Sequence, residues 1–172
     1  MTISKGTKDK MTTIVGKNCL IMAYSHLAHD CNVKDNCIIV NGVQVGGHVE
    51  IGEHAIIGGG SLVHQFSKIG DHSMIAGGSL VRKDVPPYVK AAREPLSYVG
   101  INSVGLRRRG FKSSKIIDIQ NIYRILYQKK YNNTQALEII AAELNPTPER
   151  DEIIQFIESS QRGIMKGYFQ RS

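Results

Sequence analysis

Residues 15–32 read VGKNCL, IMAYSH and LAHDCN, and these three six-residue units decide the fold. Each unit begins with a branched aliphatic residue and has a small residue at its fifth position. The aliphatic column continues to residue 81: Val15, Ile21, Leu27, Val33, Ile39, Val45, Ile51, Ile57, Val63, Ile69, Ile75 and Val81. The fifth-position column holds small or medium-sized residues: Cys19, Ser25, Cys31, Cys37, Val43, Val49, Ala55, Ser61, Ser67, Ser73, Ser79 and Val85. Two columns in register over so many units indicate a structural repeat.

This period predicts a left-handed parallel β-helix, with hexad repeats over residues 15–86 and a domain that spans residues 1–87. The aliphatic side chain fills the interior of each flat side, and the small side chain permits a tight corner. Three hexads make one coil, so the repeat predicts four coils stacked about 4.8 Å apart. Glycines at the corners supply turn conformations. Pro86 and Pro87 end the ladder because proline has no backbone N–H.

The first fourteen residues only partly follow the period. Ile3 lies in the aliphatic frame, but Asp9 breaks it. Residues 9–14 are therefore predicted to form a loop inserted at a corner. The repeat begins part-way through a coil without the cap that solenoids need, so we expect the chain to lack an N-terminal part.

The pattern changes after the repeat. Residues 88–112 are predicted to be a linker that carries a basic cluster, Arg107–Arg109 with Lys112. Residues 113–172 show a helical period and predict a domain of three helices. The expected N-caps are Ser113 or Ser114, Thr134, and Thr147 with Pro148 at the first helical position.

Composition narrows the class of protein. The chain has 172 residues, no tryptophan and a formal charge of +7, which suits an acidic partner. The start of the chain resembles no signal peptide, and no apolar run reaches the roughly 18 residues that span a bilayer. A cytoplasmic location is therefore expected. The three cysteines fall in the small column, which favours core residues over disulfides.

The histidines all fall outside the interior columns. His29, His48 and His64 are placed on one face in successive coils, with His26 at the corner that leads into it. This grouping predicts a site with an outward-facing imidazole as general base. Asp30 follows His29, and a carboxylate beside an imidazole can hold its tautomer, provided that the chain bends there.

Two other features of the sequence bear on the site. Gly47 precedes His48 and would let a backbone N–H approach a ligand, as an oxyanion donor must. His54 and His72 lie together on a different face, where we interpret them as ordinary surface positions.

Several segments resemble the UDP-N-acetylglucosamine acyltransferase family. They are HLAHDC (residues 26–31), GHV (47–49), VHQF (63–66), DVPPY (84–88) and GLRRRGF (105–111). The resemblance covers almost the whole chain and is more specific than the hexad repeat. It implies transfer of a 3-hydroxyacyl chain from acyl carrier protein to the sugar 3-hydroxyl of UDP-N-acetylglucosamine, the first step of lipid A biosynthesis. It also implies a homotrimer with sites between subunits, and no metal or cofactor is expected.

The resemblance implies roles for particular residues. His29 would be the general base, Asp30 the residue that orients it, and Gly47 the oxyanion donor. The remaining implied residues bind the substrates: His26, His48, His64 and Gln65 at the sugar and pantetheine, Asn102, Arg108 and Arg109 at the nucleotide, and Gly77 at the groove that measures acyl length. The chain departs from the family in two ways. Family members have several more coils before the first residue seen here, and Val104 stands where they usually have Glu.

Three alternatives stay open at the level of the sequence. A γ-class carbonic anhydrase shares the β-helix and binds zinc through three histidines, which requires imidazoles that converge at about 2.0–2.1 Å from the metal. A non-catalytic trimeric scaffold would fit a chain that begins in mid-repeat. The related N-acyltransferase of the same pathway usually carries an N-terminal uridine-binding domain, for which this sequence has no counterpart.

Overall fold

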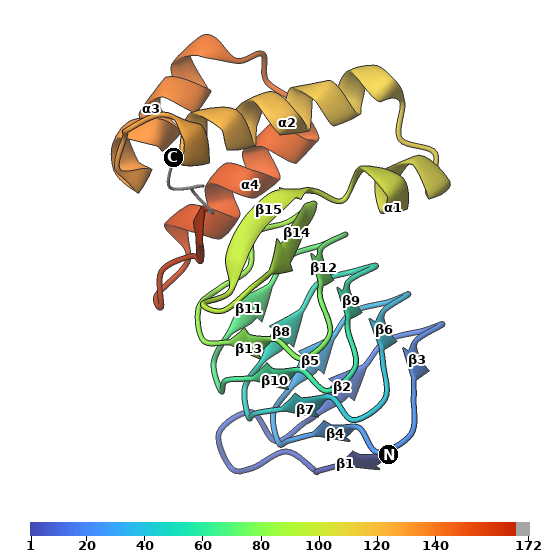
Figure 1. Ribbon diagram of the computed structural model, residues 1–172. Helices are drawn as coiled ribbons and strands as arrows, with labels where there is room; N and C mark the ends of the chain where they lie inside the picture. Colours follow the sequence, from blue (N-terminus) through green and yellow to red (C-terminus); the bar gives the residue numbers. More distant parts are fainter. Residues whose placement is uncertain (168–172) are drawn as a thin grey trace.

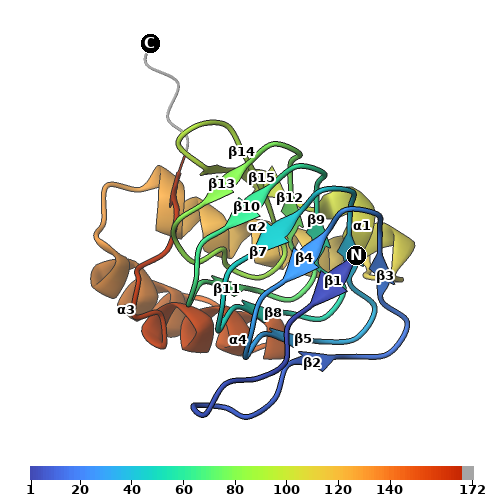
Figure 2. The same cartoon turned by 90° about the horizontal axis from the view of Figure 1, so that it is seen from below.

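The computed structural model describes residues 1–167, and it shows a triangular solenoid followed by helices (Figure 1, Figure 2). Wall A contains β1 (Thr2–Ile3), β4 (His26–Leu27), β7 (Gln44–Val45), β10 (Leu62–Val63) and β13 (Leu80–Val81). Wall B contains β2 (Ile14–Val15), β5 (Asn32–Val33), β8 (Glu50–Ile51) and β11 (Lys68–Ile69). Wall C begins with β3 (Leu20–Ile21), β6 (Ile38–Ile39), β9 (Ile56–Ile57) and β12 (Met74–Ile75).

The strand register confirms the predicted coil. Within each wall the solenoid strands are parallel, and Leu27 pairs with Val45, which pairs with Val63. This spacing of eighteen residues is three hexads, as the repeat requires. The β-helix is therefore the fold that the two sequence columns indicated.

The interior of the solenoid is built from those columns. Leu27, Ile39 and Ile57 are fully buried, and so are small residues such as Cys37. Burying one such aliphatic side chain contributes roughly 1.5–3 kcal/mol, so each coil gains stability from the residues of this stacked column. Cys19 is only partly buried because it lies in the first coil, which has no coil beneath it among the described residues.

The predicted inserted loop is present, and it lies at the corner between walls A and B. Ile3 and Val15 occupy equivalent positions in β1 and β2, twelve residues apart instead of six. The connection, residues 4–13, therefore has six residues more than a regular corner and runs outside it (Figure 2).

Residues 88–112 contain more structure than the expected linker. β14 (Val89–Ala92) continues wall C by pairing in parallel with β12, and β15 (Ser97–Ile101) pairs with β14 in antiparallel fashion. A short helix, α1 (Ser103–Arg108), follows. The hexad period does not extend to this hairpin, which is why the sequence pattern did not reveal it. β16 (Lys166–Gly167) completes wall C beside β15.

The three predicted helices are α2 (Ser113–Gln128), α3 (Asn133–Glu143) and α4 (Pro148–Glu158). The Thr147 cap of α4 is confirmed, since its side chain accepts from the Arg150 amide. Two expected caps are wrong: α2 begins after Lys112 without a side-chain cap, and Asn132, not Thr134, caps α3. Asn132 and Gln135 form a capping box: the side chain of each accepts a hydrogen bond from the backbone amide of the other. Among residues 1–167, no helix is long and apolar enough to cross a membrane.

Asp84 ties the segment after α4 to the last coil. Its buried carboxylate accepts from the Lys68 amide at 2.8 Å and from the Ser160 hydroxyl at 2.6 Å. Its backbone carbonyl accepts from the Met165 amide at 2.9 Å. The chain after α4 therefore returns to the corner between walls A and B, where the candidate site lies.

Candidate active site

The candidate site is built on a column of corner residues between walls A and B. Asp30, His48 and Phe66 are eighteen residues apart and occupy the same corner in successive coils, with φ values of 59°, 60° and 64°. Non-glycine residues rarely adopt this left-handed conformation, and it bends the chain sharply. The bend turns the Asp30 side chain back toward His29, as a contact between these two neighbours requires.

His29 and Asp30 form a hydrogen-bonded pair. His29 Nδ1 lies 2.9 Å from Asp30 Oδ2; the Asp30 side chain is fully buried, whereas that of His29 is 42% exposed. Burial alone would raise the pKa of Asp30, but hydrogen bonds from Thr7 and His29 outweigh it and lower the pKa to about 2. Asp30 is therefore an anion at neutral pH. It favours the His29 tautomer with the proton on Nδ1 and leaves Nε2 free to accept a proton.

Gly47 lies directly beneath the His29 ring. A Cβ atom at this position would lie 2.7 Å from His29 Cε1 and 2.8 Å from Nε2. Any side chain at residue 47 would therefore displace the imidazole. Gly47 is buried beside the ring, and its N–H donates no hydrogen bond to another group within residues 1–167.

His48 completes the cluster. Its ring packs edge-on to His29, with 5.1 Å between centroids, and stacks on Phe66 at 4.6 Å. His48 Nε2 lies 3.6 Å from Asp30 Oδ2. Ligand atoms of His29, Asp30 and His48 all lie within 4.8 Å of one another, close enough for a metal ion. However, Asp30 Oδ2 already accepts hydrogen bonds from Thr7 and His29, which favours a proton-transfer site over a metal centre.

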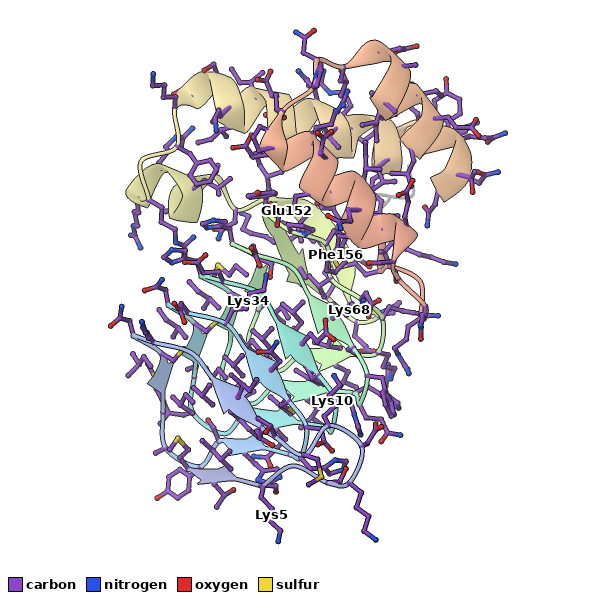
Figure 3. All side chains as sticks on the ribbon, turned by 180° about the vertical axis from the view of Figure 1, so that it is seen from behind. Lys5, Lys10, Lys34, Lys68, Glu152 and Phe156 are labelled. Atoms are coloured by element: carbon purple, nitrogen blue, oxygen red, sulfur yellow. The ribbon has the colours of Figure 1, made fainter. Side chains whose placement is uncertain are left out.

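A cleft of about 590 Å³ opens beside His48. The loop between β1 and β2 contributes Asp9 and Lys10, and the segment after α4 contributes Gln161 and Arg162. Lys10 and Lys68, both part of the lining, are labelled in Figure 3. The cleft therefore reaches the cluster at His48, between two segments far apart in the sequence; His29 itself does not line it.

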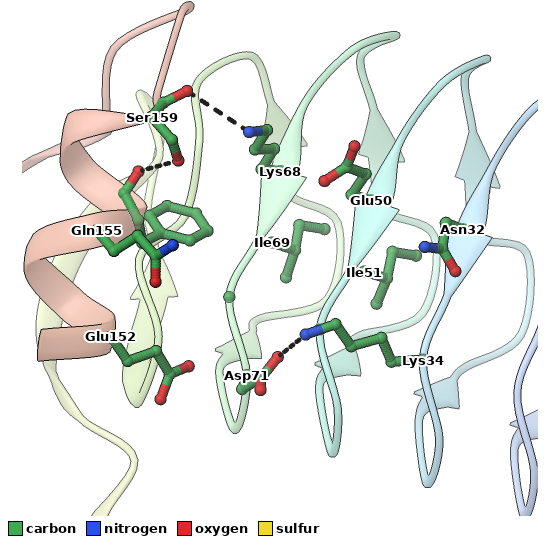
Figure 4. Close-up of a pocket in the computed structure, with 13 residues that line it drawn as sticks. Asn32, Lys34, Glu50, Ile51, Lys68, Ile69, Asp71, Glu152, Gln155 and Ser159 are labelled. Carbon is green, nitrogen blue, oxygen red and sulfur yellow. Dashed lines mark hydrogen bonds and ion pairs between the residues drawn. The ribbon is translucent and has the colours of Figure 1, made fainter. Parts of the chain in front are cut away.

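A second cavity, of about 330 Å³, lies between wall B and α4 (Figure 4). Its polar groups are largely engaged with the protein: Lys34 Nζ lies 3.3 Å from Asp71 Oδ1, and Glu152 accepts from the Tyr88 hydroxyl. Neither His29 nor His48 lines it. This cavity is thus less suited to proton transfer than the cleft at His48.

His54 and His72 belong to a stack of aromatic rings at the second corner, which lies between walls B and C. Our interpretation of them as ordinary surface positions was therefore wrong. Their rings stack at 5.0 Å, and His72 also stacks on Tyr88 at 5.5 Å and meets Phe111 edge-on. Burial first, and then the charge of Arg109, lower the pKa of His72 to about 4. His72 is therefore neutral at pH 7 and serves packing.

Comparison with known proteins identifies the family. Residues 84–165 match a model described as UDP-N-acetylglucosamine O-acyltransferase, domain 2, and residues 12–47 and 48–83 match the bacterial transferase hexapeptide model. The acyl-[acyl-carrier-protein]–UDP-N-acetylglucosamine O-acyltransferase of Aquifex aeolicus is 56% identical over 96% of this chain. The chain belongs to the UDP-N-acetylglucosamine O-acyltransferase family.

A solved structure and a second relative of that family support the assignment. The UDP-N-acetylglucosamine acyltransferase of Bacteroides fragilis superposes with a TM-score of 0.92 and 45% identity, over 94% of this chain and 63% of the relative. The Psychromonas ingrahamii O-acyltransferase is 57% identical over 96% of this chain and 63% of its own length. The chain covers 64% of the Aquifex protein and so spans just under two thirds of these relatives.

The residues that the family resemblance assigns to the nucleotide lie around α1. Asn102 is buried, caps α1 through the Gly105 amide and donates to the His72 carbonyl at 3.0 Å. Arg108 is exposed, whereas Arg109 donates to the His54 carbonyl at 3.1 Å. The backbone of the stack at the second corner thus anchors both ends of α1. The roles of Asn102, Arg108 and Arg109 at the nucleotide stay predictions.

The other predicted substrate residues are more dispersed. His26 Nδ1 lies 2.7 Å from the Thr2 hydroxyl, and His64 Nδ1 lies 3.0 Å from the Gln65 carbonyl oxygen. Neither contact involves His29 or His48, which pack directly against each other. Gly77 is exposed on the corner after β12, next to Gly78, which has a φ of 69°.

Sequence reasoning missed three contacts of the cluster. Thr7 and Thr13 in the inserted loop bond to Asp30, and Phe66 stacks on His48. The eighteen-residue coil could have placed Phe66 beside His48. The hexad frame, which holds until Asp9, predicts Thr7 in the column of small residues; the structure instead exposes Thr7 and bonds it to Asp30.

Proposed function

We propose that this chain transfers a 3-hydroxyacyl group from acyl carrier protein to the 3-hydroxyl of UDP-N-acetylglucosamine, with His29 as general base. One observation carries the proposal: in a chain of this family, a half-exposed imidazole is held by a buried carboxylate and packs against Gly47, whose backbone N–H has no partner within residues 1–167. Acyl transfer needs these parts, a base for the attacking hydroxyl and a donor for the oxyanion.

The proposed reaction follows from this geometry. His29 Nε2 takes the proton from the sugar hydroxyl as its oxygen attacks the thioester carbonyl carbon. The carbonyl π electrons move to oxygen, and the Gly47 N–H stabilises the oxyanion that forms. The tetrahedral intermediate then collapses, the C–S bond breaks, and the leaving sulfur receives the proton from His29. Asp30 stays ionised throughout and stabilises the transient imidazolium.

The proposed partners follow from charge and surface. The formal charge of +7 suits an acidic carrier protein in the cytoplasm. We expect a homotrimer in solution, because Leu62 on wall A and Phe66 beside His48 are 48% and 51% exposed and a second copy would cover them. Light scattering that gives three chains per particle would agree with this expectation. A monomer under native conditions would contradict it.

Product analysis tests the proposed reaction. The protein is incubated with a purified 3-hydroxyacyl carrier protein and UDP-N-acetylglucosamine, and the products are separated and weighed by mass spectrometry. We expect an ester of the nucleotide sugar, and none with an acceptor that lacks the 3-hydroxyl. Equal product from both acceptors, or no ester from either, would refute the proposal.

Arg108 offers a test of nucleotide binding. Its exposed guanidinium can hold phosphate in both the ground state and the transition state. We therefore expect Arg108→Ala to raise KM for the nucleotide sugar about ten- to hundredfold with a smaller effect on kcat. Arg107→Ala, a change in the adjacent exposed arginine, is the matched control. A large loss of kcat at unchanged KM would argue against this role.

Gly77 offers a test of acyl-length selection. Gly78 and not Gly77 has the positive φ of the turn, so turn geometry does not require a glycine at 77. In our proposal the missing side chain leaves the acyl groove open, and each buried methylene contributes about 0.8 kcal/mol. We expect Gly77→Met to reduce transfer from long donors and spare short ones. Gly77→Ala is the control, because it brings the same Cβ within 3.1 Å of the Gly59 carbonyl oxygen without the longer chain. An unchanged length preference in Gly77→Met would refute the assignment.

A further inference from the structure

The loop inserted between β1 and β2 makes its main contacts with Asp30. The Thr7 amide donates to Asp30 Oδ1 at 2.9 Å, and the Thr7 hydroxyl donates to Oδ2 at 2.5 Å. The Asp30 amide in turn donates to the Thr13 hydroxyl at 2.9 Å. Two threonines from a single loop therefore hold both the side chain and the backbone of the residue that holds His29.

The loop is built to place Thr7 at this point. A Cβ at Gly6 would lie 2.0 Å from the Thr12 nitrogen, so the two arms of the loop cross where only a glycine fits. The Met11 amide donates to the Thr7 carbonyl at 2.8 Å and closes the turn. Close packing of this kind fixes the position of the Thr7 donors before any substrate arrives.

We infer that Thr7 is a positioning residue for the proposed transfer, which orients the Asp30 carboxylate and, through it, the His29 imidazole. Asp30 Oδ2 receives two hydrogen bonds, one from the Thr7 hydroxyl and one from His29 Nδ1. The Thr7 hydroxyl fixes the carboxylate plane, and this plane sets the direction of the bond to the ring. Without it, Asp30 can rotate, and His29 Nε2 loses its fixed direction toward the acceptor.

The inference rests on the proposed function, but its first consequence can be measured without any transfer. Charge-assisted donors favour an ionised carboxylate, and burial opposes it. Thr7→Val keeps the shape of the side chain and the backbone donor but removes the hydroxyl. We expect it to raise the pKa of Asp30 from about 2 to its ordinary value of about 4 or above. Carbon-13 NMR of the aspartate carboxyls measures this value, with Asp30→Asn to assign the signal.

Two further variants separate positioning from a general effect on the loop. Thr7→Ser retains a hydroxyl and should keep the pKa of Asp30 close to its native value. Thr12→Val makes the same chemical change in the same loop, at an exposed residue whose side chain bonds to nothing within residues 1–167. We expect it to leave Asp30 unchanged. Circular dichroism verifies that each variant is folded.

Transfer kinetics provide the second readout. At pH 7 Asp30 stays ionised in Thr7→Val, so the expected loss comes from orientation: kcat falls on the order of tenfold while KM for the nucleotide sugar stays the same. Thr7→Ser should recover most of the loss. The inference is overturned if Asp30 in Thr7→Val titrates as in the native protein, or if kcat stays within about twofold of the Thr12→Val control. If the pKa of Asp30 rises but the native protein forms no ester, Thr7 still holds Asp30 and only the proposed function fails.

Discussion

His29→Ala lowers kcat for acyl transfer by about 10²- to 10⁴-fold, the range typical of a general base. The variant removes the only group of the His29–Asp30 pair that reaches solvent, since the Asp30 side chain is fully buried. Because the imidazole lies outside the solenoid interior, we expect the protein to remain folded and KM for the nucleotide sugar to change little. Steady-state kinetics with purified substrates measure both constants.

His54→Ala is a useful companion to that variant. It removes an imidazole from the second corner, between walls B and C, where the ring stacks on His72 and does not contact His29. We expect its loss of activity to be much smaller than that of His29→Ala. If His29→Ala retained more than about half of the native kcat, His29 could not be the base.

Gly47→Ala should reduce kcat about 10²- to 10³-fold, comparable to the loss of an oxyanion donor. The added methyl group would lie 2.7–2.8 Å from two atoms of the His29 ring, closer than carbon and nitrogen atoms approach without a bond. The imidazole must therefore move away from the position that Asp30 sets and from the Gly47 N–H. We expect a lower melting temperature as well, because the displaced ring loses its hydrogen bond to Asp30.

A double variant distinguishes this mechanism from a general backbone effect. In His29→Ala the ring is absent, so Gly47→Ala should then cause little further loss of stability or kcat. Fully additive losses in the double variant would mean that the methyl group acts on something other than His29.

The β-helix was predictable because its interior repeats every six residues and its coil every eighteen. That periodicity gave the pairing of Leu27 with Val45 and also placed the histidines outside the core. The contact between His29 and Asp30 was predicted only if the chain bends at Asp30, and that bend depends on the left-handed conformation of Asp30. A hexad pattern reports which side chains point inward and does not give the conformation of each corner.

The features that escaped prediction arise where the period stops. The hairpin of β14 and β15 extends wall C through residues without hexad spacing. The stack of His54, His72 and Tyr88 depends on left-handed corners that align rings from three coils. Thr7 reaches Asp30 only because the loop closes in space, and its sequence contains no trace of that contact.

A crystal structure of the protein with UDP-N-acetylglucosamine would show whether His29 is placed to take the proton from the sugar hydroxyl. We expect the 3-hydroxyl oxygen to lie within hydrogen-bond reach of His29 Nε2, at about 2.6–3.2 Å, with the nucleotide extending toward α1. A sugar bound with its 3-hydroxyl away from His29, for example beside the stack of His54 and His72 or in the cavity between wall B and α4, would contradict it.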